Sequence, residues 1–335
     1  MTKEHDLINR YFAPLCSGPD EAPAFGLRDD TALLVDRSGD DLLITTDTLV
    51  ASVHFFPDDS PASIAAKSLA VSVSDIIAKG GEPESYLLNL ALPASVNETW
   101  LLVFSKALER AQKHFGCQLV GGDTVSTQGP LMVTITLAGK IARDKMVRRK
   151  GAGVGDLVFV GGPIGDGALG LMVRNIELKQ RGVNLTSKQS MFLLDHYLSP
   201  QPRLELAPLI VKYASAAMDV SDGLAGDFEK LCEASGVGGQ IKSSLVPLSD
   251  ATKSALAQNP QLLKTILSGG DDYQVLCCVP DVKADEFEGK AKGVTRIGEI
   301  VALEEGVSVR DDQDKPLDLS HGAFDHFSDK KGSEE

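Results

Sequence analysis

The chain has 335 residues, of which 43% are hydrophobic, and it is therefore long enough and apolar enough for two globular domains. Its formal net charge of −14 opposes binding to nucleic acid and to anionic membranes, and it would also repel a phosphorylated substrate unless metal ions stood between them. No apolar run reaches membrane-spanning length and the five cysteines include no CxxC pair, so we expect a cytoplasmic protein with reduced thiols and no signal peptide.

The N-terminal region contains the first pair of adjacent carboxylates. Residues 6–15 predict a short amphipathic helix, and Asp29 and Asp30 later precede an apolar strand. Like charges side by side are costly unless they are solvated or bound to a cation. A solvated turn and a cation site therefore both remain open at this position.

A second polar motif accompanies the strand that begins at Leu42. We expect this strand to end with Thr45, Thr46 and Asp47, and His54 follows seven residues later. A strand holds such a carboxylate rigidly and can present it to a ligand, although an Asx turn would explain the same residues.

Residues 61–81 predict a largely buried helix that Ser60 caps. Asp75 therefore lies in or beside the core, where an unpaired carboxylate is very costly. A backbone cap, an arginine or a metal ion would satisfy it. We favour a metal ion because Asp30 and Asp47 need one too.

A strand at 86–92 and a helix at 96–115 lead to a glycine-rich motif that contains Gly122 and Asp123. Glycines at the end of a strand let a ligand approach the backbone and expose N–H groups to phosphate. A tight turn is the alternative interpretation of this motif.

A basic loop at residues 143–156 interrupts an otherwise acidic chain. We place the domain boundary there, with residues 1–148 and 149–327 forming the two domains and residues 328–335 a disordered tail. Arg149 suits phosphate recognition because its guanidinium is a fork-shaped donor, whereas the alternative is a solvated linker.

The second half contains two further acidic junctions. A strand at 157–160 opens it, followed by a glycine-rich turn without a Walker or dinucleotide fingerprint. Asp219, Ser221 and Asp222 crowd one junction between a strand and a helix, whose N-terminal dipole would favour an anion. Asp271 precedes the next apolar strand.

Aspartates beside glycine or hydroxyl residues are the recurring feature of the chain. They are Asp29, Asp30, Asp47, Asp75, Asp123, Asp219, Asp222 and Asp271. No cluster of His and Cys accompanies them, which argues against zinc, whereas oxygen ligands suit Mg²⁺. These residues predict a Mg²⁺-dependent enzyme that acts on phosphate substrates.

The motifs also resemble a known family in their order along the chain. They read GLRDDTALL, ITTDTLVASVHF, KSLAVSVSDIIAKGGEP, LVGGDT, RRKGAGVGD, MDVSDGL and SGGDDY. Together they resemble the thiamine-monophosphate kinase family, from about residue 6 to residue 327. The resemblance implies the two-domain α/β (α+β) fold of the aminoimidazole-ribotide-synthetase-like ATP-binding superfamily, with N-terminal domains paired in a homodimer.

The resemblance further implies that ATP phosphorylates thiamine monophosphate to thiamine diphosphate, the last step of that cofactor's biosynthesis, by direct in-line transfer assisted by several Mg²⁺ ions. No covalent nucleophile is expected. The implied metal ligands are Asp30, Thr45, Thr46, Asp47, Asp75, Asp123, Asp219 and Asp222. The implied ATP contacts are Gly122, Asp123, Arg149 and Ser221. The implied contacts with thiamine monophosphate are His54, Asp271 and Phe324.

Four residues depart from the family pattern. Arg28 replaces a glycine before the paired carboxylates, and Ser72 stands where asparagine is usual. Asp271 is one methylene shorter than the usual glutamate, and Phe324 replaces tyrosine or tryptophan. The last two belong to the implied substrate pocket, so they bear on affinity more than on reaction type.

Other members of the superfamily are the alternatives. Selenophosphate synthetase needs a reactive cysteine in a glycine-rich segment, a context that Cys16 lacks, and the hydrogenase-maturation member ends in a catalytic cysteine, whereas this chain ends in Gly-Ser-Glu-Glu. Aminoimidazole ribotide synthetase has a similar ATP site but fits the segment around His54 poorly. A protein that binds Mg²⁺ or nucleotide without catalysis is the alternative of another class, although idle buried carboxylates are costly.

Overall fold

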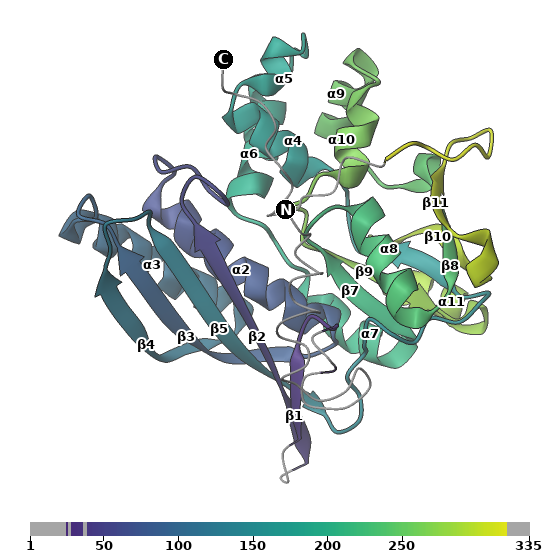
Figure 1. Cartoon of the computed structure of the whole chain (residues 1–335), viewed down its shortest axis with the longest axis horizontal. Coiled ribbons are helices and arrows are strands. Elements are labelled where there is room, and N and C mark those ends of the chain that lie inside the picture. The colour runs from purple at the N-terminus through teal and green to yellow at the C-terminus, as the bar shows by residue number, and fades with distance from the viewer. Residues whose placement is uncertain (1–24, 26–27, 36–38, 320–335) are drawn as a thin grey trace.

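The computed structural model describes residue 25, residues 28–35 and residues 39–319. The helix expected at residues 6–15, the side chain of Phe324 and the expected tail lie outside these ranges. The described chain forms two mixed β-sheets, each covered by helices, and so has the expected two-part α/β architecture (Figure 1).

The N-terminal sheet has the strand order β1-β2-β5-β3-β4. Its strands are β1 (Ala32–Val35), β2 (Asp40–Val50), β3 (Glu82–Leu92), β4 (Gln118–Ser126) and β5 (Met132–Ala142). Only β3 and β4 pair in parallel, and the other neighbours are antiparallel. The edge strand β4 is exposed along its whole length.

Helices α2 (Pro61–Ala78) and α3 (Glu98–Phe115) cover one face of this sheet (Figure 1). The Ser60 hydroxyl accepts the main-chain N–H of Ser63 at 3.1 Å, which confirms the predicted cap. The helix ends three residues before the predicted end at residue 81. In length and composition α2 would suffice to cross a membrane, but 72% of it is buried in the protein, so it is a core helix.

The C-terminal sheet has the strand order β11-β8-β10-β6-β9-β7. Its strands are β6 (Leu157–Val160), β7 (Ala216–Val220), β8 (Gly238–Lys242), β9 (Gln274–Val279), β10 (Thr295–Val301) and β11 (Val307–Arg310). All neighbours are antiparallel except β8 and β11. Strand β6 has the predicted bounds.

Most helices of the chain lie in its second half. Helices α4, α5, α6, α9 and α10 gather at one end of the molecule (Figure 1). The α-helices are α4 (Asp166–Arg174), α5 (Glu177–Gln180), α6 (Ser187–Leu198), α7 (Ala207–Tyr213), α8 (Leu224–Ser235), α9 (Asp250–Gln258), α10 (Leu262–Ser268) and α11 (Asp281–Lys290). Short 3₁₀ turns are η4 (Leu204–Leu206), η5 (Ser243–Leu245) and η6 (Leu303–Glu305).

Helix α2 contacts both sheets, because β7 and β9 of the second half pack against it as well. One of the hydrophobic clusters among the described residues therefore spans both sheets. It includes Leu43 and Val133 of the N-terminal sheet, Ile76 of α2, and Phe159 and Val275 of the C-terminal sheet. The expected domain boundary falls in the connection between β5 and β6.

Two predicted strand ends are wrong. Strand β2 does not end at Asp47, because it pairs with β5 as far as Val50. Asp123 likewise lies inside β4, which pairs with β3 as far as Ser126. Because side chains alternate along a strand, neighbouring residues of these motifs point to opposite faces of the sheet.

Candidate active site

Three carboxylates from distant parts of the sequence meet beside α2. Asp30 precedes β1, Asp75 lies on α2 and Asp219 lies on β7, and each offers an oxygen atom within 4.8 Å of the others. Asp47 of β2 points to the same side, where it accepts a hydrogen bond from the Ser72 hydroxyl at 2.7 Å. We call these four aspartates the carboxylate cluster.

Hydroxyl groups also orient Asp75 of α2 and Asp219 of β7. Thr45 donates to Asp75 at 2.5 Å, and Ser74 donates to Asp219 at 2.9 Å. Asp75 therefore has a protein partner that the sequence did not predict. A hydroxyl supplies a hydrogen bond but no positive charge, so it does not balance a buried carboxylate.

The pKa values of three members of the cluster are raised above the usual range of a carboxyl group. Burial and the charge of Asp30 raise the pKa of Asp219 to about 8. Burial, with the charge of Asp47, raises the pKa of Asp75 well above its usual range, and burial also raises the pKa of Asp47. A bound cation would reverse these effects, since it favours the ionised form of each ligand.

Asp30 differs from the other members because basic side chains surround it. Burial opposes its ionisation, but Arg149 and Lys79 pair with it and lower its pKa. Lys79 is fully buried, lies 3.0 Å from Asp29 and donates to the main-chain oxygen of Ala217 at 2.6 Å. Lys79 thereby ties the start of β1 to β7.

Two predicted metal ligands, Thr46 and Asp123, and the predicted ATP contact Gly122 lie away from the cluster. The Thr46 hydroxyl faces the other side of β2, where it donates to the main-chain oxygen of Ile135 at 3.1 Å. Asp123 is exposed on β4, and Gly122 beside it has a φ of 147°. A Cβ atom at Gly122 would collide with the carbonyl oxygen of Leu88, so this position requires glycine.

The turn between β7 and α8 is built around Asp227, a residue that was not predicted from the sequence. One oxygen of buried Asp227 accepts the main-chain N–H groups of Ser221, Asp222 and Gly223, at 3.0, 3.0 and 3.2 Å. Lys230 lies 2.6 Å from Asp222 and 2.8 Å from Asp227. Asp227 therefore fixes the turn that presents Ser221 and Asp222.

Lys67 of α2 joins two of the residues predicted to contact substrate. Its amino group lies 3.0 Å from Asp271, donates to the main-chain oxygen of His54 at 3.2 Å and lies 3.9 Å from the centre of the Tyr197 ring. Tyr273 also donates to Asp271, at 3.0 Å. The third predicted contact, Phe324, lies outside the described residues.

Both halves of the chain match family models, namely AIR synthase related protein, N-terminal domain, at residues 28–141 and its C-terminal domain at residues 153–310. The thiamine-monophosphate kinase of Escherichia coli K12 is 37% identical over 330 residues, which cover 97% of this chain and 98% of that protein. The chain belongs to the thiamine-monophosphate kinase family. The thiamine-monophosphate kinase of Bacillus subtilis is 33% identical over 310 residues, covering 90% of this chain and 93% of that protein.

Solved structures agree with membership of the thiamine-monophosphate kinase family. AaThiL complexed with AMPPCP and TMP is 33% identical and has a TM-score of 0.83, with 97% of each chain covered. The hydrogenase maturation protein HypE in complex with ATP is 19% identical, with a TM-score of 0.66 and 93% of this chain and 94% of that chain covered, which indicates a shared fold only. The family resemblance predicted from the motifs is confirmed.

Two lysines of this family member were missed by the sequence analysis. Lys67 and Lys79 are buried charges within or at the end of an apolar helix. A lysine among apolar residues is a usable signal, because an ammonium group is rarely buried without an anionic partner. Their partners were not apparent from the sequence, since they come from the segment before β1 and from the loop before β9.

Proposed function

We propose that this protein transfers the γ-phosphoryl group of ATP to thiamine monophosphate, giving thiamine diphosphate and ADP. The observation that carries the proposal is the likeness over nearly the whole chain to proteins named thiamine-monophosphate kinase. A structural relative named as complexed with AMPPCP and TMP supports the pairing of a nucleotide with that acceptor. The carboxylate cluster supplies a site consistent with phosphoryl transfer.

The cluster has the donor atoms that Mg²⁺ prefers. Its members offer carboxylate oxygens alone, and the raised pKa values of three of them indicate negative charge that the protein leaves only partly balanced. We assign Asp30, Asp47, Asp75 and Asp219 as Mg²⁺ ligands, with Thr45 as an additional oxygen donor. Bound Mg²⁺ would neutralise phosphate charge and polarise the γ-phosphoryl group.

The chain's own residues would bind and orient the two substrates. We assign Arg149 to the nucleotide, and the phosphates would then compete with Asp30 for its guanidinium. Ser221 and Asp222 lie on the turn that Asp227 fixes, where we expect further contacts with nucleotide and Mg²⁺. His54 and Asp271 would contact thiamine monophosphate. The Thr46 hydroxyl faces away from the cluster, so Thr46 would bind Mg²⁺ through its main-chain oxygen.

Gly122 and Asp123 lie far from the carboxylate cluster of the same chain, because β5 and β3 stand between β4 and β2 in the N-terminal sheet. In register, Asp47 pairs with Ile135, Ile135 with Leu88, and Leu88 with Gly122. Gly122 thus lies three strand spacings from Asp47, or about 14 Å. A nucleotide site that includes all of these residues is more readily built from two chains than from one.

We therefore propose a homodimer in which β4 faces a second copy of the chain. Strand β4 is an edge strand whose exposed apolar residues are Leu119, Val120 and Val125. An exposed apolar edge is normally covered, because it otherwise promotes aggregation. In this proposal residues 1–148 form the dimerisation and nucleotide-binding domain, and residues 149–327 form the second domain.

The deciding experiment incubates the purified protein with ATP, Mg²⁺ and thiamine monophosphate and measures thiamine diphosphate. Product is expected only when all three are present, and Asp47→Asn is expected to abolish it. Asp40→Asn is the matched control, since it makes the same substitution at the exposed first residue of the same strand. Product from Asp47→Asn at the wild-type rate would contradict the assigned metal role.

The alternatives give different outcomes in the same experiment. If ATP with Mg²⁺ raises the melting temperature but no thiamine diphosphate forms, the acceptor is wrong and the substrate of aminoimidazole ribotide synthetase is tried next. Binding of ATP and Mg²⁺ without transfer to either acceptor would support a binding protein. Absence of any response to millimolar Mg²⁺ and ATP would contradict every one of these functions.

A further inference from the structure

The ammonium group of Lys79 lies beside the carboxylate cluster, out of reach of solvent. Lys79 is the residue at which α2 ends, and its side chain is fully buried. The C-terminus of a helix favours a cation only modestly, and an ammonium group is rarely buried without anionic partners. The metal, nucleotide and substrate assignments above make no use of this charge.

Three oxygen atoms surround the ammonium group of Lys79, one for each of its N–H bonds. They are a carboxylate oxygen of Asp29 at 3.0 Å, a carboxylate oxygen of Asp30, and the main-chain oxygen of Ala217 at 2.6 Å. Ala217 lies on β7, two residues before Asp219. The ammonium group is therefore held between the paired aspartates and the strand that carries another member of the cluster.

Two arginines engage the remaining oxygens of the same pair. The guanidinium of Arg149 pairs with the other oxygen of Asp30, and its main-chain N–H donates to the other oxygen of Asp29 at 3.1 Å. Arg148 lies 3.6 Å from Asp29 as well. All four carboxylate oxygens of this pair therefore face donors from the protein, and the two negative charges are fully balanced by positive ones.

The other three members of the carboxylate cluster have only neutral partners. Within the described part of the chain, Asp47, Asp75 and Asp219 accept hydrogen bonds from hydroxyl groups, and no lysine or arginine forms an ion pair with them. Carboxylates this close together repel one another when they are ionised. Uncompensated negative charge is therefore concentrated on these three side chains and is absent from the pair that Lys79 engages.

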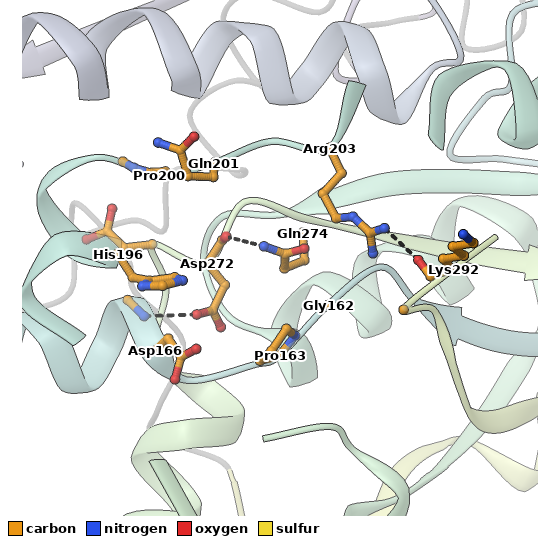
Figure 2. Close-up of a pocket in the computed structure, with 13 residues that line it drawn as sticks. Gly162, Pro163, Asp166, His196, Pro200, Gln201, Arg203, Asp272, Gln274 and Lys292 are labelled. Atoms are coloured by element: carbon orange, nitrogen blue, oxygen red, sulfur yellow. Dashed lines mark hydrogen bonds between the residues drawn. The ribbon is translucent and has the colours of Figure 1, made fainter. Parts of the chain in front are cut away.

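A single buried carboxylate can be satisfied without a cation, as Asp272 shows (Figure 2). Its two oxygens accept the main-chain N–H groups of Gly165 and Gly167, at 2.7 and 3.0 Å. Asp29 and Asp30 are adjacent and their side chains are buried, so their mutual repulsion has to be offset by positive charge. The cation that this pair requires is supplied by the protein itself.

We propose that the ammonium group of Lys79 is a resident cation of the active site, which occupies the place of one Mg²⁺ ion at Asp29 and Asp30. This inference rests on the proposed function. Lys79 is a positioning residue that keeps Asp30 at the cluster before any metal ion binds. Asp30 remains available to Mg²⁺ through its other oxygen once the nucleotide takes Arg149. The number of metal ions that this chain binds is thereby set in part by a side chain.

The test counts bound metal ions in the absence of nucleotide. Protein stripped with EDTA and dialysed is titrated with Mn²⁺ as a paramagnetic substitute for Mg²⁺, and free Mn²⁺ is measured by electron paramagnetic resonance. Lys79→Met is expected to bind one Mn²⁺ ion more per chain than wild type, because methionine is similar in length but leaves the carboxylate pair without the ammonium group. Added Mg²⁺ should also raise the melting temperature of Lys79→Met by more than that of wild type.

Two controls separate the charge from the packing of the side chain. Lys79→Arg retains the positive charge and should bind the wild-type number of Mn²⁺ ions, so an additional ion in this variant would contradict a role of the charge. Lys113→Met makes the same substitution at an exposed position in the last turn of α3 and should change neither the number of ions nor the response of the melting temperature.

Asp29→Asn tests the inference even if Lys79→Met does not fold, as judged by circular dichroism. Because the protein's own cations hold Asp29, its replacement should leave the number of bound Mn²⁺ ions unchanged and the Kd within about threefold of wild type. Loss of one ion, or binding weakened by about 10-fold or more, would show that a metal ion bridges the pair and would overturn the inference. A folded Lys79→Met variant with the wild-type number of ions would overturn it too.

The outcomes also separate this inference from the proposed function. If the Mn²⁺ counts are as expected but the wild-type protein forms no thiamine diphosphate, the function is wrong and the role of Lys79 stands. If thiamine diphosphate is formed but Lys79→Met binds no additional ion, the role of Lys79 alone is wrong.

Discussion

Replacing Asp219 with asparagine is expected to stabilise the metal-free protein. Asp219 is buried in the carboxylate cluster, where burial and Asp30 raise its pKa from 3.8 to about 8. Between about pH 4 and pH 8, the folded protein therefore holds a proton on Asp219 that the unfolded chain releases. The stability associated with that proton is complete below about pH 4 and is lost as the pH rises through about 8.

The magnitude follows from the pKa difference. At about 1.4 kcal/mol for each pKa unit, the raised pKa of Asp219 destabilises the folded protein by about 5 kcal/mol at pH 8 and by about 2 kcal/mol at pH 5. Asparagine does not ionise, and its amide oxygen can still accept the hydrogen bond from Ser74. Asp219→Asn should therefore be more stable than wild type in EDTA, by a margin that grows with pH.

Urea unfolding in EDTA at several pH values between 5 and 8 measures this margin. Mg²⁺ is then added, and it should stabilise the wild-type protein more than the variant, because it binds the ionised cluster of the folded state. Asp281→Asn, at an exposed position of α11, should change neither result. A variant that is less stable than wild type at pH 8, or whose margin does not change with pH, would refute the reasoning.

Three other substitutions test separate parts of the site. Asp47→Asn should reduce phosphoryl transfer by at least about 100-fold and leave the unfolding free energy within about 1 kcal/mol of wild type, as measured by product formation and urea unfolding; a normal rate would contradict it. Lys67→Met breaks the ion pair with Asp271 and should raise the KM for thiamine monophosphate more than the KM for ATP, and an equal effect on both would indicate a general structural role. Asp227→Asn weakens three charge-assisted hydrogen bonds and should lower the unfolding free energy by about 3 kcal/mol, so a loss below about 1 kcal/mol in urea would count against it.

Elements with strong local signals could be predicted from the sequence. Ser60 followed by Pro61 gave the start of α2, because a side-chain cap and a preset φ act within a few residues. Strand β6 was bounded by polar and glycine residues on both sides and has the predicted limits. The order of short motifs was sufficient for the family, which likeness over nearly the whole chain confirms.

The ends of β2 and β4 could not be predicted, because the strands with which they pair determine them. Thr45, Thr46 and Asp47 have the composition of a turn, yet β5 pairs with this stretch from about ninety residues further along the chain. The same pairing turns Thr46 away from the cluster. Asp123 was grouped with the other aspartates by composition, whereas its place on the edge strand depends on the topology of the whole sheet.

The basic partners of the aspartates were also beyond local reasoning. Lys79 meets Asp29 and Asp30 from about fifty residues away, and Lys67 meets Asp271 from about two hundred. A lysine is normally solvated, so its burial becomes understandable only when a distant carboxylate is placed beside it. The sequence therefore predicted the acidic residues of this site and Arg149, and it missed Lys67 and Lys79.

The core that α2 shares between the two sheets has a consequence for how the protein can be divided. If the chain were cut after residue 148, the C-terminal fragment would expose Phe159 and Val275, which now pack in that common core. Each fragment alone is expected to aggregate, whereas the two expressed together should assemble. For the same reason the intact protein should melt in one calorimetric transition, despite its two-domain architecture.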